Sequence, residues 1–269
     1  MLSADAATED FRRIAGTLAL HGVVVVRNFV SASGCAVLRT EFAALLEQAE
    51  VESAPTFKRV NRSRFMRVLD TELDRARYPA VATSFYSTQI EQIAGQFYGE
   101  HAFRVNPELY LTHDVECMDF NGSWHLDPSR SLKFLLYLND VDAGNGAMMY
   151  VPGSNHHSIY RIHYHRYRGE DEFPVFLPDN EVPASRVSLN GPAGTAVIFD
   201  TAGLHRAGEL TAGRERMVIR GHCYARPALR ERIFNRLRRS KLNPLRLART
   251  EDELVAPEFR SRPRWTVTP

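Results

Sequence analysis

Residues that could bind a transition metal stand in two separate stretches of the chain. His125 and Asp127 lie two residues apart in NGSWHLDPSRSLKFLLYLND (121–140), and His205 lies in GTAVIFDTAGLHRAGE (194–209). In an extended strand, residues two apart point to the same side, so the first pair presents an imidazole and a carboxylate to one point. Two histidines and one carboxylate form the facial triad that binds Fe(II) in non-haem oxygenases. The triad leaves positions open for a chelating co-substrate and for O₂.

A co-substrate that chelates through one end and carries a carboxylate at the other needs a cation for that far end. The strand-like segment RERMVIRGHCYA (214–225) supplies arginines. A guanidinium offers a planar fork that matches a carboxylate with two hydrogen bonds. Arg214, Arg216 and Arg220 share one side of an extended strand, so alternation alone does not choose among them.

Further polar side chains on predicted strands are candidates for contact with the co-substrate or substrate. Lys133 stands in an otherwise apolar run, where a lysine must pair with an acid or extend to solvent. It points either into the site, toward the co-substrate, or outward to the surface. Tyr110 and Thr112, on the strand before the ligands, either donate to the co-substrate or are ordinary strand residues.

The elements that must position these residues begin with a mainly helical part. Apolar spacing predicts one helix over 7–20 and another from Ser31 or Ser33 to about Glu50, with a buried β-branched strand over 21–29 between them. A further helix is expected over 79–98. The polar, arginine-rich residues 51–78 are expected to form a loop near the entrance of the site.

The rest of the chain alternates short apolar runs with Gly, Pro and Asn turns. This pattern is typical of a barrel or jelly roll. The expected strands are 103–112, 117–126, 131–139, 147–152, 186–189, 195–200 and 214–225.

A single domain over 1–269 is expected, because 44% hydrophobic content supports one core in a chain of 269 residues. Residues 1–100 form a mostly helical N-terminal part, and 101–226 form the jelly-roll core with an insert at 155–183. A C-terminal helix, near 228–240, and a basic tail complete the chain over 227–269.

Composition excludes several classes of protein. A net charge of +2 gives no case for nucleic acid as a partner, and no apolar segment is long enough for a membrane span. The acidic N-terminus MLSADAATEDF does not resemble a signal peptide. Cys35, Cys117 and Cys223 are odd in number and widely spaced, which indicates a reducing compartment. We therefore expect a soluble cytoplasmic protein.

The order HLD (125–127), NGAMMYVPGS (145–154), His205 and Arg216 resembles the phytanoyl-CoA dioxygenase-like family of Fe(II)/2-oxoglutarate oxygenases, over roughly residues 8–226. The resemblance implies a mainly β fold with flanking helices, a double-stranded β-helix or cupin-like jelly roll. It implies Fe(II), 2-oxoglutarate as co-substrate and O₂. It also selects Arg216, eleven residues after His205, as the anchor for 2-oxoglutarate.

The chain also departs from the family's pattern. Leu126 stands where the family often has Gln, Met148 where it often has Thr, Asn155 where it usually has His, and Ala207 where Ser often follows the distal histidine. The secondary contacts to 2-oxoglutarate and the identity of the substrate are therefore not carried over. Halogenases of the family replace the metal-binding aspartate with a small residue, and Asp127 is present, so halogenation is not expected.

These observations predict an oxygenase that hydroxylates an unactivated C–H bond of a small molecule, with succinate and CO₂ as co-products. The substrate is expected to be polar, anionic or carrier-linked; Arg59, Arg62, Arg64 and Arg67 either hold an anion or form a solvated face. Two alternatives stand beside this prediction. One is a non-redox, cupin-like metal enzyme, an isomerase or hydrolase, that has no use for an arginine anchor. The other is a non-catalytic jelly-roll binding protein.

Overall fold

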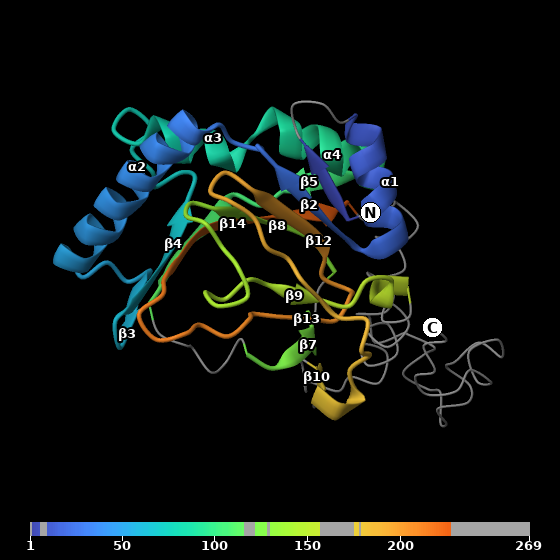
Figure 1. Cartoon of the computed structure of the whole chain (residues 1–269). Coiled ribbons are helices and arrows are strands. Elements are labelled where there is room, and N and C mark those ends of the chain that lie inside the picture. The colour runs from blue at the N-terminus through green and yellow to red at the C-terminus, as the bar shows by residue number, and fades with distance from the viewer. Residues whose placement is uncertain are drawn as a thin grey trace, which may run out of the picture.

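Two β-sheets lie face to face, and the helices cover the outer face of the larger one (Figure 1). The computed structural model describes residues 2–5, 10–115, 122–127, 130–156, 175–177 and 179–226. Within these ranges the larger sheet has nine strands and the smaller has five. The expected C-terminal helix near 228–240 and most of the 155–183 insert lie outside the described residues. The fold is the double-stranded β-helix that the sequence predicts.

The helices begin where the sequence supplies a cap. Asp10 accepts a hydrogen bond from the backbone of Arg12 at the start of the first helix, and Ser31 accepts one from Gly34 at the start of the second. The helix expected over 79–98 is instead two helices, because the backbone leaves the helical region at Tyr86 and Ser87. The helices are α1 (Phe11–His21), α2 (Ala32–Val51), α3 (Pro79–Phe85) and α4 (Thr88–Tyr98).

The larger sheet carries the strands that form one wall of the jelly roll. Its central strands are antiparallel, and β5 (Phe103–Val105) pairs with β14 outside the main order. The order is β1 (Ser3–Asp5), β2 (Val23–Arg27), β12 (Ala196–Asp200), β8 (Leu132–Tyr137), β14 (Arg216–Ala225), β6 (Glu108–Asp114), β4 (Ser63–Leu69) and β3 (Phe57–Val60).

The smaller sheet forms the opposite wall and carries the predicted metal ligands. Its strands are short, since turns interrupt them near the site. The order is β10 (Val175–Leu177), β7 (Trp124–Leu126), β13 (His205–Arg206), β9 (Met149–Tyr150) and β11 (Val187–Ser188).

Alternation along the buried strands divides the core into two layers. In β2, Val24 and Val26 pack against the helices, whereas Val23 and Val25 pack between the sheets. This strand is buried on both faces, which explains its unbroken β-branched run. The layer between the sheets ends at Phe199, which lines the open end where the site lies.

The expectation of a loop over 51–78 is wrong, because residues 57–69 form the β3–β4 hairpin at the edge of the larger sheet. The chain turns at Asn61, whose φ of 53° is the left-handed conformation that asparagine tolerates. The arginines that suggested a loop pair on the surface instead. Arg59 forms an ion pair with Glu50 of α2 (2.7 Å), and Arg67 forms one with Glu108 of β6 (3.5 Å).

Two of the cysteines, Cys35 and Cys223, are buried free thiols, and Cys117 lies outside the described residues. Among the described residues, none of the helices is long and apolar enough to cross a membrane.

Candidate metal centre

The structure brings the three predicted metal ligands together. His125 and His205 face each other directly across the β7–β13 pair, with ring centroids 4.4 Å apart. Asp127 follows β7 at once, and its Oδ1 lies 3.9 Å from Nε2 of His125 and 3.6 Å from Nε2 of His205. One ligand atom from each residue lies within 4.8 Å of the other two. One metal ion fits this arrangement.

Backbone carbonyls fix the orientation of both imidazoles. Nδ1 of His125 donates to the carbonyl of Ser123 (2.8 Å), and Nδ1 of His205 donates to the carbonyl of Gly203 (2.9 Å). This arrangement turns each Nε2 toward Asp127. Nε2 of His205 is buried without a hydrogen-bond partner among the described residues. A metal ion would satisfy this atom, as is usual for histidine ligands that are oriented by a carbonyl.

Electrostatics favour the charge states that metal binding requires. Burial, followed by the neighbouring His205, lowers the pKa of His125 to about 4, so its imidazole is neutral at pH 7. Burial alone would raise the pKa of Asp127. The proximity of His205 and the charge of Lys133 outweigh it, and they hold the pKa of this carboxyl well below its usual range. Neutral imidazoles and an ionised carboxylate are the forms that bind a metal.

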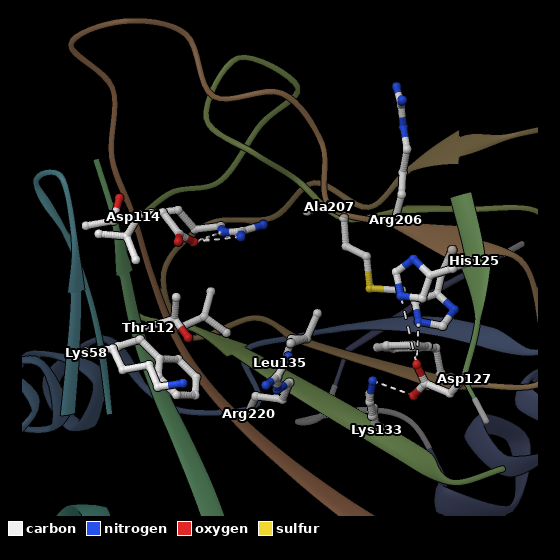
Figure 2. A pocket seen from close by; sticks show the side chains of 18 residues that line it. Lys58, Thr112, Asp114, His125, Asp127, Lys133, Leu135, Arg206, Ala207 and Arg220 are labelled. Atoms are coloured by element: carbon white, nitrogen blue, oxygen red, sulfur yellow. Dashed lines mark hydrogen bonds and ion pairs between the residues drawn. The ribbon is translucent and has the colours of Figure 1, made fainter. Parts of the chain in front are cut away.

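The ligands lie in a cavity of about 550 Å³ at the open end of the jelly roll, here called the site cavity (Figure 2). This volume suits a small molecule together with a co-substrate. The apolar part of its wall includes Leu135, Met148, Phe199 and Val218.

Lys133 points into the site cavity, and the surface alternative is excluded. Only 14% of its side chain is exposed, and its Nζ lies 2.5 Å from Oδ2 of Asp127. Lys133 therefore contacts the carboxylate that stands among the metal ligands. In this position it can hold one oxygen of Asp127 while the other faces the histidines.

Arg216 lines the site cavity, as does Thr112. Nε and Nη2 of Arg216 donate to Oδ2 of Asp114 (3.0 and 2.7 Å), and Nη1 donates to the carbonyl of Gly146. The sequence did not reveal this carboxylate partner. Arg214 forms an exposed ion pair with Asp142 (2.7 Å) outside the site cavity. The structure therefore leaves Arg216 and Arg220, which both line the cavity, as possible anchors for an anion.

The NGAMMYVPGS segment braces the site at both of its ends. Asn145 donates to the carbonyl of Glu215 (3.0 Å), the residue before Arg216, and the adjacent Gly146 accepts from the Arg216 guanidinium. At the other end, the hydroxyl of Ser154 accepts from the backbone N–H of Leu204 (2.8 Å), which precedes His205. The motif thus fixes both the arginine and the distal histidine.

Tyr110 lies beside the site cavity and is not among the residues that line it. Its hydroxyl donates to Glu108 (3.0 Å), and its ring lies under the Arg220 guanidinium, 4.6 Å away. Its role in contacting the co-substrate stays a prediction, as does that of Thr112.

Sequence reasoning missed several lining residues. Lys58 comes from the β3–β4 hairpin and points toward the cavity (Figure 2). The apolar residues of this hairpin do not alternate regularly with its charged ones, so no two-residue period revealed it in the sequence. Arg206, next to His205, also lines the cavity and stacks over Trp124 at 5.3 Å.

A His-x-Asp pair and a distant histidine, converging at the open end of a double-stranded β-helix, define the class of mononuclear non-haem metal enzymes with this fold. Residues 18–218 match the family described as phytanoyl-CoA dioxygenase (PhyH), and the chain belongs to this family. The match confirms the resemblance seen in the sequence. It also confirms the enzyme class, a non-haem Fe/2-oxoglutarate dioxygenase.

Known proteins similar to this chain agree with the family. Ectoine dioxygenase of Stutzerimonas stutzeri (strain A1501) is 27% identical over 210 residues, 68% of this chain and 67% of that protein. The crystal structure of EctD from S. alaskensis with bound Fe matches with a TM-score of 0.57 at 18% identity, covering 79% of this chain and 76% of that one.

The matching structures include two further proteins, both crystallised with the co-substrate. EvdO2 from Micromonospora carbonacea var. aurantiaca, complexed with 2-oxoglutarate, has a TM-score of 0.57 at 17% identity over 82% of this chain and 93% of that one. The epimerase SnoN, in complex with Fe³⁺, alpha ketoglutarate and nogalamycin RO, has a TM-score of 0.54 at 18% identity, over 80% and 83%.

Proposed function

We propose that this protein hydroxylates an unactivated C–H bond of a small molecule, with succinate and CO₂ as co-products. The observation that carries the proposal is the presence of Arg216 in the same cavity as the His125, Asp127 and His205 group. A non-redox metal enzyme would need the three ligands and would have no use for the arginine.

In this proposal the three ligands hold the metal, and neighbouring side chains and carbonyls fix the charge and orientation of these ligands. Bound Fe(II) and 2-oxoglutarate together supply the oxidation of a C–H bond by O₂. Lys133 keeps Asp127 ionised and holds its Oδ2. The carbonyls of Ser123 and Gly203 keep both imidazoles in the required tautomer.

Arg216 is proposed to anchor the far carboxylate of 2-oxoglutarate. Its guanidinium donates to Asp114 through Nε and Nη2 and to Gly146 through Nη1. A guanidinium has five N–H donors, so part of its fork can turn to a carboxylate in the cavity. Asp114 then shares the charge of the arginine with the co-substrate.

The wall beside this arginine is apolar. Met148 and Ala207, at positions where the family often has hydroxyl groups, line the site cavity. The chain therefore anchors its co-substrate with fewer neutral hydrogen bonds and relies more on the charge of Arg216. An apolar wall also excludes water from the reacting C–H bond.

The test measures binding and turnover separately. We expect the protein to bind one Mn²⁺ or Zn²⁺ by calorimetry and then to bind 2-oxoglutarate, and Fe(II)-loaded protein to form succinate under O₂ with a panel of small carboxylic acids. His205→Ala should abolish metal uptake with the fold retained. The exposed His156→Ala serves as the matched control and should bind metal normally.

Different failures would indicate different functions. Stoichiometric metal uptake without 2-oxoglutarate binding would favour the non-redox, cupin-like metal enzyme. Purified protein that takes up no divalent metal would favour a non-catalytic jelly-roll binding protein.

A further inference from the structure

Arg220 is a cation of the site cavity that makes no direct ion pair among the described residues, although the charges of Asp127 and Asp114 attract it from beyond contact. It lines the cavity, and its Nε is buried without a hydrogen-bond partner among the residues that the structure describes. No ion pair joins it to another residue in the described part of the chain. Burial lowers its pKa, yet arginine keeps its charge in proteins. A partly desolvated charge without a direct partner is costly for folding, which points to a functional role.

Most of the other cations that line the cavity already have a carboxylate partner. Lys133 pairs with Asp127 (2.5 Å), and Arg216 pairs with Asp114. Arg206 pairs with Asp179 (3.4 Å). Lys58, the remaining one, is exposed at the edge of the hairpin.

A specific support holds Arg220 in place. The ring of Tyr110 lies 4.6 Å below its guanidinium carbon, close enough for a cation–π contact. Tyr110 is itself fixed by the hydrogen bond to Glu108 (3.0 Å) and by the ring of Phe65 (centroids 5.8 Å apart). A guanidinium held in this way needs little ordering when it receives an anion.

Strand register gives the place of Arg220 relative to the metal ligands. Arg220 is opposite Leu135 in the β14–β8 pair, and Lys133, which contacts Asp127, is opposite His222. The backbone of Arg220 therefore lies two residues along the strands from the Lys133–His222 backbone pair, a spacing of roughly 7 Å. Figure 2 shows Arg220 beside Leu135, with Thr112 on one side and Lys133 on the other.

We propose that Arg220 binds a carboxylate of the substrate. The inference rests on the proposed function, in which Arg216 takes the co-substrate and leaves Arg220 for a second anion. The substrate is then a small carboxylic acid, and the C–H bond that is oxidised lies a few bonds from the carboxylate. Lys58, at the mouth, adds attraction for the incoming anion.

The same guanidinium could instead receive the far carboxylate of 2-oxoglutarate, so the experiment must separate the two sources. Protein loaded with Zn²⁺ and saturated with 2-oxoglutarate is titrated with trifluoroacetate, a simple carboxylate, and binding is followed by ¹⁹F NMR. Calorimetry measures the affinity for 2-oxoglutarate in the same samples. The variants are Arg220→Met, Arg220→Lys and, as the matched control, Arg214→Met, whose arginine pairs outside the cavity.

We expect Arg220→Met to weaken trifluoroacetate binding at least roughly tenfold and to leave 2-oxoglutarate affinity unchanged. Arg220→Lys, which keeps the charge and loses the fork, should bind the probe with intermediate affinity. Arg214→Met should behave as the unaltered protein, and melting curves confirm that each variant is folded.

Two results would overturn the assignment. Unchanged probe binding in Arg220→Met would show that the anion binds elsewhere. Loss of 2-oxoglutarate binding in that variant would make Arg220 the co-substrate anchor. A protein that takes up no metal or 2-oxoglutarate at all would overturn the proposed function alone, because trifluoroacetate titrated into the metal-free protein still tests Arg220.

Discussion

At the scale of single residues, two arginines on one strand differ in a way that their sequence positions do not reveal. Arg216 is compensated by Asp114, 102 residues earlier in the chain, whereas Arg220 has no ionic partner among the described residues. Alternation placed both on one side of β14. The pairing across β14 and β6 that supplies Asp114 depends on strand register, which the sequence alone did not give.

Arg216→Met should remove both the co-substrate anchor and the partner of Asp114. We expect 2-oxoglutarate affinity to fall by about 3 kcal/mol, roughly a hundredfold, and stability to fall by about 1–3 kcal/mol because the carboxylate loses its partner. Calorimetry and urea unfolding measure the two effects.

The double variant Arg216→Met with Asp114→Asn separates the two roles of this arginine. It should recover much of the stability, since no charge is left unpaired, without recovering 2-oxoglutarate binding. Full affinity for 2-oxoglutarate in either variant would exclude Arg216 as the anchor.

Arg220→Met should stabilise the protein that lacks substrate. The substitution removes a charge that has no direct ion-pair partner among the described residues, and it keeps a long side chain over the Tyr110 ring, so we expect a gain of about 1–3 kcal/mol. Urea unfolding checks this, with Arg214→Met expected within about 0.5 kcal/mol of the parent. A loss of stability in Arg220→Met would mean that the guanidinium has a structural partner.

At the scale of elements, the turns next to β9 fix the positions of the site residues more than the short strands do. β9 and β13 have only two residues each, so neither positions a ligand alone. The NG turn holds the start of β14, and the PGS turn holds the backbone before His205. Sequence reasoning found these turns through the motif, and it could not show which backbone groups they bind.

Asn145→Ala tests the NG turn. Asn145 is buried and donates to the carbonyls of Asp140 (2.7 Å) and Glu215 (3.0 Å). Its side-chain oxygen also accepts from the backbone N–H of Asp142 (2.6 Å), which would lose its acceptor, whereas Asn139 still donates to both carbonyls. We therefore expect a loss of about 1–3 kcal/mol in stability and weaker 2-oxoglutarate binding with metal uptake preserved. The exposed Asn190→Ala is the control; an equal loss of metal uptake in Asn145→Ala would show general disorder instead.

The errors of element prediction have physical causes. No regular alternation of apolar and charged residues marks the β3–β4 hairpin, whose charged residues stand at 58, 59, 62, 64 and 67; arginine and lysine are common on edge strands such as β3. The apolar spacing of 79–98 continued through Tyr86 and Ser87, where the backbone breaks the helix. The long buried runs, such as β2 and β12, were predicted closely because burial on both faces leaves few choices of residue.

At the scale of the molecule, the site is where the two sheets and the hairpin meet. The smaller sheet supplies the predicted metal ligands, β8 and β14 supply Lys133, Arg216 and Arg220, and the hairpin supplies a wall. The convergence of the three side chains could be predicted because their types and spacing are diagnostic even without coordinates. The hairpin wall and the Asp114 pairing could not, since they depend on long-range packing.

The whole molecule should also lose stability in acid through two largely desolvated histidines, His125 of the site and His222 of β14. Burial is the main cause that lowers the pKa of His125 to about 4 and that of His222 to about 3. Unfolded histidine has a pKa of about 6.5, so below that pH the unfolded chain takes up protons that the folded protein does not. Stability of the metal-free protein is therefore full above about pH 6.5 and falls toward pH 4, by about 1.4 kcal/mol per pH unit for each histidine.

Urea unfolding of the metal-free protein between pH 4 and pH 7 measures this slope. His222→Gln should reduce the slope by the contribution of one histidine, because glutamine takes up no proton in either state; the exposed His156→Gln is the matched control. Bound Zn²⁺ should make the loss steeper, since a metal that requires neutral His125 adds stability at pH 7 that protons remove. A slope that His222→Gln does not alter would show that this imidazole is already accessible to protons in the folded protein.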